Sequence, residues 1–247
     1  MPSPSEIREQ VERMDRLQYL LYADARQSLL VVLQGLDAAG KDGVIRHLFS
    51  GMNPQGTSVA GFKEPSKAEL AHDFLWHAHM PAPSRGEVVI YNRSHYEDVL
   101  VVRVHNLVAR SVWSQRYELI NGFEKMLAGN RTRILKFYLH ISPEEQLARF
   151  KQRLDDPARH WKISESDYSE RRFWQEYTAA YEDALALTST HWAPWFVIPA
   201  NHKWFRNLAI SQIIADAMED MGLELPQPQV NLAEIRRKYH AAKHESL

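Results

Sequence analysis

The chain reads LLVVLQGLDAAGKDG between residues 29 and 43. Leu29 to Leu33 form a continuous apolar run, which is typical of a strand buried on both faces of a parallel sheet. The residues after it match G-x4-G-K, the pattern of a phosphate-binding loop, in the required context of strand, loop and helix. Small residues let successive backbone N–H groups face an anion, and the positive end of the next helix adds to their field. The stretch therefore predicts a P-loop fold.

This loop supplies the first candidate site residues. The expected phosphate-binding members are Gly35, Ala38, Ala39, Gly40, Lys41, Asp42 and Gly43. Lys41 is also the expected catalytic cation, because its ammonium group can reach phosphate oxygens. P-loops normally place Ser or Thr after this lysine as a magnesium ligand, but the chain has Asp42 there. Asp37 is the expected replacement, since Mg²⁺ prefers oxygen ligands and keeps several waters.

Further apolar runs continue the strand pattern along the chain. They lie at Ser58–Phe62, Val88–Tyr91, Ile134–Ile141 and Phe196–Ile198. Segments with helical spacing of apolar residues precede or separate them, at Ile7–Ala25, Ser66–His79, Trp113–Leu127, Pro143–Leu154, Asp167–Leu187 and Trp204–Met221. This alternation predicts an α/β fold with a doubly wound parallel sheet of about five strands flanked by helices.

Length and composition limit the possibilities. The 247 residues suit a single domain, 1–247, with a lid segment at about 145–172 and a C-terminal tail at 223–247. A net charge of -1 gives no sign of a nucleic-acid partner. The absence of cysteine fits a reducing compartment, for which we expect the cytoplasm. No stretch approaches the roughly 18 apolar residues of a membrane span, so no membrane partner is expected.

A second polar cluster, YNRSHYED at residues 91–98, follows the run at Val88. Such a strand lies beside the P-loop strand in P-loop enzymes, so its carboxyl end faces the phosphates. Arg93 offers a planar fork for phosphate oxygens. Asn92, at the position of the usual Walker B acid, and Glu97 are predicted to contact nucleotide. Asp98 is predicted to be catalytic and a second metal ligand.

The segment from 149 to 172 is rich in basic residues. It holds five acids and seven basic residues, and the basic residues are Arg149, Lys151, Arg153, Arg159, Lys162, Arg171 and Arg172. Arg149 and Arg153 lie four apart on the predicted helix, so they share a face and can both point into one channel. A solvated charged surface is the alternative. We predict a polyanion groove lined by Lys63, Arg149, Arg153 and Lys162, with Arg153 also catalytic, and leave Lys203 and Arg206 undecided between the site and the surface.

Four blocks together resemble the polyphosphate kinase 2 family: GLDAAGKDG, YNRSHYEDVLV, RFKQRLDDPARHWK and APWFVIPANHKWFRN. They span about residues 15 to 222. The resemblance implies a thymidylate-kinase-like P-loop fold with a helical lid, a homo-oligomer (dimer or tetramer), and reversible phosphoryl transfer between inorganic polyphosphate and adenine nucleotides. It also implies Mg²⁺, with Mn²⁺ as a substitute, and carries over Asp37, Lys41, Arg93 and the basic lid residues as site positions.

The branch of the family and the donor are separate questions. Asn92, Glu97 and Asp98 resemble the branch that phosphorylates both AMP and ADP. An ATP-dependent nucleoside monophosphate kinase shares the loop and the fold and is the nearest alternative. A non-catalytic nucleotide-binding P-loop module is a further alternative, although the sequence shows no responsive partner surface.

Overall fold

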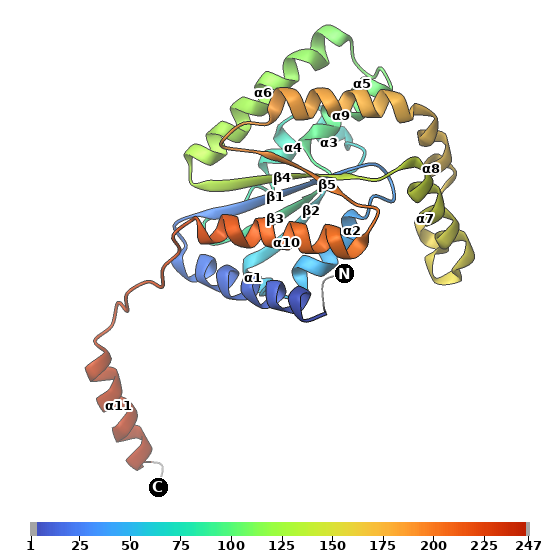
Figure 1. Ribbon diagram of the computed structural model, residues 1–247. Coiled ribbons are helices and arrows are strands. Elements are labelled where there is room, and N and C mark those ends of the chain that lie inside the picture. The colour runs from blue at the N-terminus through green and yellow to red at the C-terminus, as the bar shows by residue number, and fades with distance from the viewer. Residues whose placement is uncertain (1–3, 246–247) are drawn as a thin grey trace.

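The computed structural model describes residues 4–245 and has a parallel sheet of five strands at its centre (Figure 1). The strand order is β2-β3-β1-β4-β5. The strands are β1 (Ser28–Gln34), β2 (Thr57–Gly61), β3 (Val88–Asn92), β4 (Thr132–His140) and β5 (Trp195–Pro199). The predicted parallel sheet of about five strands, flanked by helices, is confirmed.

Strand β1 is the middle strand of the sheet, and every one of its residues is buried. Its Leu33 pairs with Asn92 of β3 on one side and with Phe137 of β4 on the other. The carboxyl ends of these three strands therefore lie along one edge. Side chains and loops that follow β1 and β3 meet there, which is the usual place for a ligand in an open α/β sheet.

Helices cover both faces of the sheet. Leu29, Val31 and Leu33 pack on one side, and Leu30 and Val32 pack on the other. The first side is covered by α1 (Pro4–Asp24), α2 (Lys41–Phe49) and α10 (Lys203–Glu219), and the second by α4 (Trp76–His79), α5 (Val101–Val104), α6 (Arg110–Gly129) and α9 (Trp174–Thr188). Figure 1 shows α1 and α10 below the strands, and α6 and α9 above them.

The prediction of one continuous helix over Ser66–His79 is wrong, because two short helices occupy this segment. The structure has α3 (Lys67–Leu70) and α4, with a turn between them. Ser66 caps α3, and Oδ1 of Asp73 accepts a hydrogen bond from the N–H of Leu75 at 3.0 Å. Such local side-chain bonds compete with the helical hydrogen bonds of the backbone, and they end and restart the helix here.

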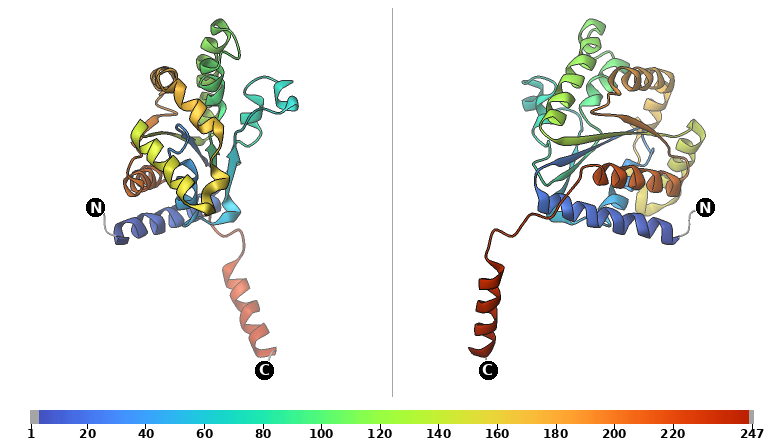
Figure 2. Two further views of the ribbon diagram at one scale, coloured as in Figure 1. Left: turned by 90° about the vertical axis from the view of Figure 1, so that its right-hand side faces the viewer. Right: turned by 60° about the vertical axis from the view of Figure 1, so that its left-hand side comes forward.

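The predicted helix Asp167–Leu187 is interrupted as well. It consists of α8 (Glu165–Glu170), a 3₁₀ turn at Arg171–Phe173 and then α9. Together with α7 (Pro143–Asp155) and a 3₁₀ segment at Pro157–Lys162, α8 stands in front of the carboxyl ends of the strands (Figure 2, left). Shorter 3₁₀ turns at Pro54–Gly56 and His95–Asp98 connect the remaining elements.

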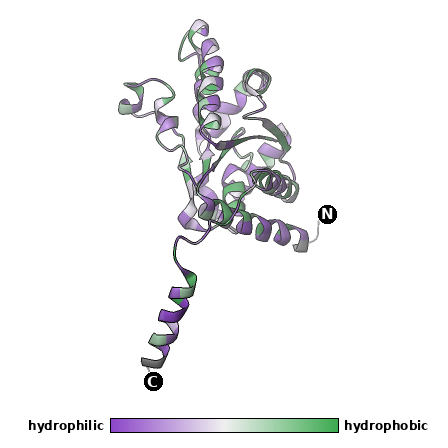
Figure 3. Ribbon diagram, turned by 90° about the vertical axis from the view of Figure 1, so that its left-hand side faces the viewer, coloured by the Kyte–Doolittle hydropathy of each residue, from purple (hydrophilic) through white to green (hydrophobic). Residues whose placement is uncertain are grey.

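The C-terminal segment leaves the body as an extended stretch and ends in α11 (Leu232–Glu245). In Figures 1 and 3 this helix stands apart from the sheet and its covering helices. Within residues 4–245, no helix combines the length and the apolar character that crossing a membrane requires.

Candidate active site

The loop after β1 depends on glycine at two positions. Gly35 has φ +150°, and a Cβ there would lie 2.8 Å from the carbonyl oxygen of Leu139. Gly40 has φ +107° and precedes α2 as its N-cap. Ala38 between them is also left-handed, with φ +61°. These conformations favour residues without a bulky Cβ, so the sequence of small residues gives a tight turn that ends at the positive end of α2.

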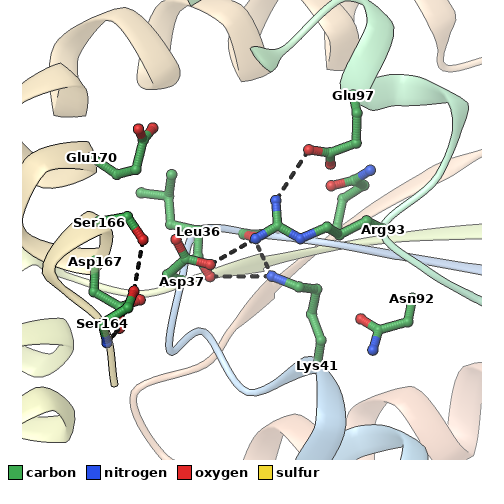
Figure 4. Close-up of polar contacts among 12 residues, drawn as sticks. Leu36, Asp37, Lys41, Asn92, Arg93, Glu97, Ser164, Ser166, Asp167 and Glu170 are labelled. Atoms are coloured by element: carbon green, nitrogen blue, oxygen red, sulfur yellow. Dashed lines mark hydrogen bonds and ion pairs between the residues drawn. The ribbon is translucent and has the colours of Figure 1, made fainter. Parts of the chain in front are cut away.

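Lys41 is the first residue of α2, and it bends back over the loop (Figure 4). Its Nζ donates to the carbonyl oxygen of Gly35 at 2.6 Å and to that of Leu36 at 3.4 Å. Burial, together with the charge of Arg93, lowers the pKa of Lys41 to about 8, while Asp37 opposes the change. A buried ammonium group with only neutral partners is ready to bind an anion.

Arg93 follows β3 and lies between two carboxylates. Its Nη2 is 2.8 Å from Oδ1 of Asp37, and its Nη1 is 3.1 Å from Oε2 of Glu97. Burial would lower the pKa of Arg93, but the two carboxylates outweigh it and keep the guanidinium charged. The backbone φ of Arg93 is +62°, which is unusual for a non-glycine residue and is the kind of strain often found at functional sites.

A pocket opens beside this pair. Its walls come from the P-loop, the end of β3, the lid and α9: Gly35, Leu36, Asp37, Arg93, Glu97, Leu100, Gln146, Glu170, Arg171, Trp174, Tyr177 and Tyr181. The sequence did not identify Gln146, Glu170, Trp174 or the two tyrosines. The only signal was the spacing of the tyrosines, four apart on one helix, which places both on the same face.

Arg149 lies under the P-loop. Its Nη1 donates to the carbonyl oxygens of Ala38 and Ala39 at 2.8 and 2.9 Å, and its Nη2 donates to that of Ala200 at 2.5 Å. The side chain is buried, and its Nε pairs with Glu145. The prediction that Arg149 faces an open channel together with Arg153 is therefore not what the structure shows. The face of α7 that carries Arg149 packs against the P-loop. Arg149 therefore holds the loop in shape through its hydrogen bonds to the loop carbonyl oxygens.

Arg206 of α10 is a second buried arginine behind the loop. A Cβ added to Gly40 would lie 1.9 Å from its Nη1. Burial lowers the pKa of Arg206 to about 10, and the charge of Arg149 contributes. No carboxylate of the described residues lies within ion-pair distance of Arg206 (≤ 4.0 Å). The two arginines thus raise the positive potential at the P-loop, and Arg206 is buried behind the loop and not on the surface.

The lid reaches the P-loop helix through Asp42. One carboxylate oxygen of Asp42 is 3.3 Å from Nζ of Lys162, and the other accepts from Nδ2 of Asn92 at 3.3 Å. Burial would raise the pKa of Asp42, but the hydrogen bond and charge of Lys162 keep it below its usual value. Asn92, Asp42 and Lys162 are thus brought together.

Three predicted site residues lie elsewhere. Arg153 binds within the lid, with Nη1 donating to the carbonyl oxygen of Lys162 at 2.9 Å. Asp98 pairs with Arg116 at 2.9 Å and is not part of the pocket wall. Burial raises the pKa of Asp98 to about 6, although Arg116 opposes this. Lys63 lines a separate cavity beyond the end of β2.

The site combines a P-loop on the central strand with a buried lysine, an arginine held between carboxylates and a basic helical lid. These features define a phosphotransferase of the P-loop kinase class. Residues 4–226 match the family model described as Polyphosphate kinase 2 (PPK2). The chain belongs to this family, and the resemblance drawn from the four sequence blocks is confirmed. The helix α11 lies outside the matched region.

Named relatives agree with this placement. The chain is 52% identical over 217 residues to the "AMP/ADP-polyphosphate phosphotransferase" of Meiothermus ruber, covering 88% of this chain and 81% of the relative. It is 46% identical over 233 residues to the "ADP-polyphosphate phosphotransferase" of Rhodopseudomonas palustris, covering 90% and 81%. The crystal structure of polyphosphate kinase 2 from Arthrobacter aurescens TC1 superposes with a TM-score of 0.93 at 40% identity, covering 95% of this chain and 84% of that one.

Proposed function

We propose that the chain transfers a phosphoryl group reversibly between inorganic polyphosphate and AMP or ADP, forming ADP or ATP, with magnesium. The observation that supports this most strongly is the pairing of Asp37 with Arg93 in the wall of one pocket, with Lys41 bound to the loop carbonyl of Gly35 in the same wall. The names of the Meiothermus and Rhodopseudomonas relatives support polyphosphate as donor and adenine nucleotides as acceptors. The alternative of an ATP-dependent monophosphate kinase has no such support.

Asp37 is the proposed protein ligand of Mg²⁺, with Mn²⁺ as a substitute. Among the described residues no group of three or more His, Cys, Asp or Glu is arranged to hold a metal ion. The single carboxylate of Asp37 fits Mg²⁺, which is commonly held by one or two carboxylates together with substrate phosphates and water. The bound ion would neutralise charge on the phosphate oxygens. Asp98 is not part of this proposal, because it does not line the pocket that Asp37 and Arg93 share.

The residues of the chain act by alignment and by charge. Phosphoryl transfer passes through a loose transition state that needs positioning more than covalent catalysis. The loop N–H groups and Lys41 hold the phosphates on either side of the transferred group. Arg93 neutralises the charge that develops on the equatorial oxygens. Because the acceptor is a phosphate oxygen, which is already ionised at neutral pH, no general base is required.

The lid provides the proposed groove for the rest of the polyphosphate. Lys162 and Arg171 contribute positive charge on the segment that faces the P-loop. Polyphosphate carries about one negative charge per unit, so several cations bind it by ion pairing and counterion release, as they bind nucleic-acid backbones. The homo-oligomeric state and the cytoplasmic location remain predictions.

The decisive experiment compares donors. Purified protein is incubated with Mg²⁺, AMP and long-chain polyphosphate, and the nucleotides are separated by chromatography over time. We expect ADP first and then ATP, and no ADP when polyphosphate is left out. Formation of ADP only from AMP plus ATP would establish the monophosphate kinase instead.

A further inference from the structure

Gln146 of α7 is a buried amide that bridges the P-loop and the lid. Its Nε2 donates to the backbone carbonyl oxygen of Asp37 at 2.9 Å, and its Oε1 accepts from Nη1 of Arg171 at 2.6 Å. A carbonyl oxygen can only accept a hydrogen bond and a guanidinium can only donate one, so these two partners fix the orientation of the amide. Gln146 thus binds the loop with one end and the lid with the other.

The carbonyl that Gln146 holds belongs to the peptide between Asp37 and Ala38. This peptide is trans, so the N–H of Ala38 points in the opposite direction to the carbonyl of Asp37 and is turned away from α7. Ala38 has φ +61°. Rotation of the peptide by about 180° would return this φ to the negative range that alanine prefers. The hydrogen bond from Gln146 therefore opposes a flip that would reverse the N–H.

Arg149 extends this support along the loop. It follows Gln146 on the same face of α7, and its Nη1 donates to the carbonyl oxygens of Ala38 and Ala39 at 2.8 and 2.9 Å. Helix α7 thus holds three successive carbonyl oxygens, from Asp37 to Ala39. Fixed peptides are what a loop needs to direct backbone N–H groups at an anion.

Arg171 connects the same amide to the lid. It lies in the pocket wall, on the 3₁₀ turn between α8 and α9. Its Nη1 donates to the carbonyl oxygen of Pro143, the first residue of α7, at 3.0 Å, as well as to Gln146. The end of the lid is therefore tied to α7, and through Gln146 to the peptide that follows Asp37.

We propose that Gln146 is a positioning residue for phosphoryl transfer. It holds the peptide between Asp37 and Ala38 so that the N–H of Ala38 is directed at the phosphates. The same peptide sets the direction of the Asp37 carboxylate, which meets Arg93. Through Arg171, this arrangement depends on the position of the lid. The role rests on the proposed function for the identity of the donor, but any phosphate chain bound in the P-loop needs the same peptide orientation.

Two substitutions of Gln146 separate its contacts. Gln146→Leu should lower kcat with ADP and polyphosphate at least about tenfold, because the loop is no longer preorganised. Gln146→Glu still accepts from Arg171 but cannot donate to Asp37, so it should lose kcat to a similar extent. Gln152→Leu, at an exposed position of the same helix, is the matched control and should be neutral. The Tm of all three variants should lie within about 4 °C of wild type.

Anion binding without turnover gives a second readout. Calorimetry with inorganic tripolyphosphate, in the absence of divalent metal, reports on the loop N–H groups alone. Gln146→Leu should weaken this binding at least about threefold, the effect of one misdirected hydrogen bond. The Mg²⁺ concentration for half-maximal activity should rise as well, because Asp37 is the proposed ligand, whereas Gln152→Leu should leave both quantities unchanged.

A double-mutant cycle tests the connection to the lid. Arg171→Met should lower kcat, and the exposed Arg172→Met is its control. The variant with both Gln146→Leu and Arg171→Met should lose much less than the product of the two single losses, since both break one chain of hydrogen bonds.

Three results would overturn the role of Gln146: wild-type kcat in Gln146→Glu, unchanged tripolyphosphate affinity in Gln146→Leu, or single losses that multiply in the double variant. Failure of the proposed function is recognised separately. If the wild type accepts ATP but not polyphosphate as donor, that function is wrong, and the same variants assayed with ATP as donor and ligand decide the role of Gln146.

Discussion

Nη2 of Arg93 lies 2.8 Å from Oδ1 of Asp37. The contact joins the residue after β3 to the loop after β1, two strands that are neighbours in the sheet but lie far apart in the sequence. Because Glu97 holds the other end of the guanidinium, Arg93 is positioned before any phosphate binds. A guanidinium that is already oriented loses less conformational freedom when it meets the transition state.

Arg93→Lys should lower kcat/KM at least about tenfold, which corresponds to roughly 1.4 kcal/mol of transition-state stabilisation. Lysine keeps the charge but cannot bridge two carboxylates and a phosphate with a planar fork. Steady-state kinetics with ADP and polyphosphate measure the effect. Arg85→Lys, at an exposed position before β3, is the control and should be neutral; equal activity of the two variants would remove Arg93 from the site.

Lys41→Ala should abolish turnover while leaving the fold in place. The expected loss is on the order of 3 kcal/mol or more, the scale of removing one preorganised electrostatic group. The change in unfolding free energy should stay within about 1 kcal/mol, since the variant also removes the cost of burying a charge. Lys238→Ala on α11 serves as control. Retention of more than a tenth of wild-type activity would contradict the assigned role.

The pH dependence of stability reports on the same lysine. Burial lowers the pKa of Lys41 from 10.5 to about 8. Between these two values the unfolded chain binds more protons than the folded chain, so the stability contributed by this residue increases as the pH rises. The unfolding free energy of the wild type minus that of Lys41→Met should therefore increase between pH 7.5 and pH 9.5. A constant difference would mean that Lys41 keeps an ordinary pKa in the folded state.

The same shift predicts an alkaline limb in activity. The value of kcat/KM should decline above pH about 8, because it reports on ionisations of the free enzyme and only charged Lys41 binds phosphate. The limb in kcat should lie at higher pH, since bound phosphate favours the ammonium form. Superimposable limbs in the two profiles would assign the ionisation to another group.

Gly40→Ala should destabilise the protein and remove activity. Alanine at φ +107° carries strain of about 1–3 kcal/mol. Its Cβ would also displace Nη1 of Arg206, which lies 1.9 Å from the position it would occupy. Gly61→Ala is the matched control, because a Cβ there meets nothing within 4 Å, and its effect should stay within about 0.5 kcal/mol. Urea unfolding of both variants decides the matter.

Asn92→Asp should impair AMP phosphorylation more than ADP phosphorylation. In the structure, Nδ2 of Asn92 donates a hydrogen bond to Oδ1 of Asp42 at 3.3 Å. The new carboxylate would therefore oppose Asp42 and disturb its contact with Lys162 of the lid. The shorter AMP depends more on this alignment. The ratio of kcat/KM for AMP and ADP is the measurement, and a change below about twofold, roughly 0.4 kcal/mol, would place acceptor choice elsewhere.

The sequence predicted those parts of the fold and site that rest on local pattern. The apolar run at Leu29–Leu33, followed by G-x4-G-K, was enough to predict a buried central strand, a phosphate loop and a helix beginning near Lys41. Asp37 and Arg93 could be named because each directly follows a buried strand, and parallel strands bring their carboxyl ends together. The breaks within the two predicted helices Ser66–His79 and Asp167–Leu187 were missed. Asp73 and Arg171 act there through hydrogen bonds that apolar periodicity does not record.

Only the tertiary structure decided which side of the P-loop each charged residue occupies. Arg149 and Arg153 share a helix face in sequence, yet one is buried beneath the loop and the other binds within the lid. Asp98 was paired with Arg116 of α6, and Tyr181 of α9 was brought to the pocket wall. A charge is placed by the balance between the cost of desolvation and the partners it finds. Those partners come from elements distant in the chain, so spacing along one helix or strand does not contain that information.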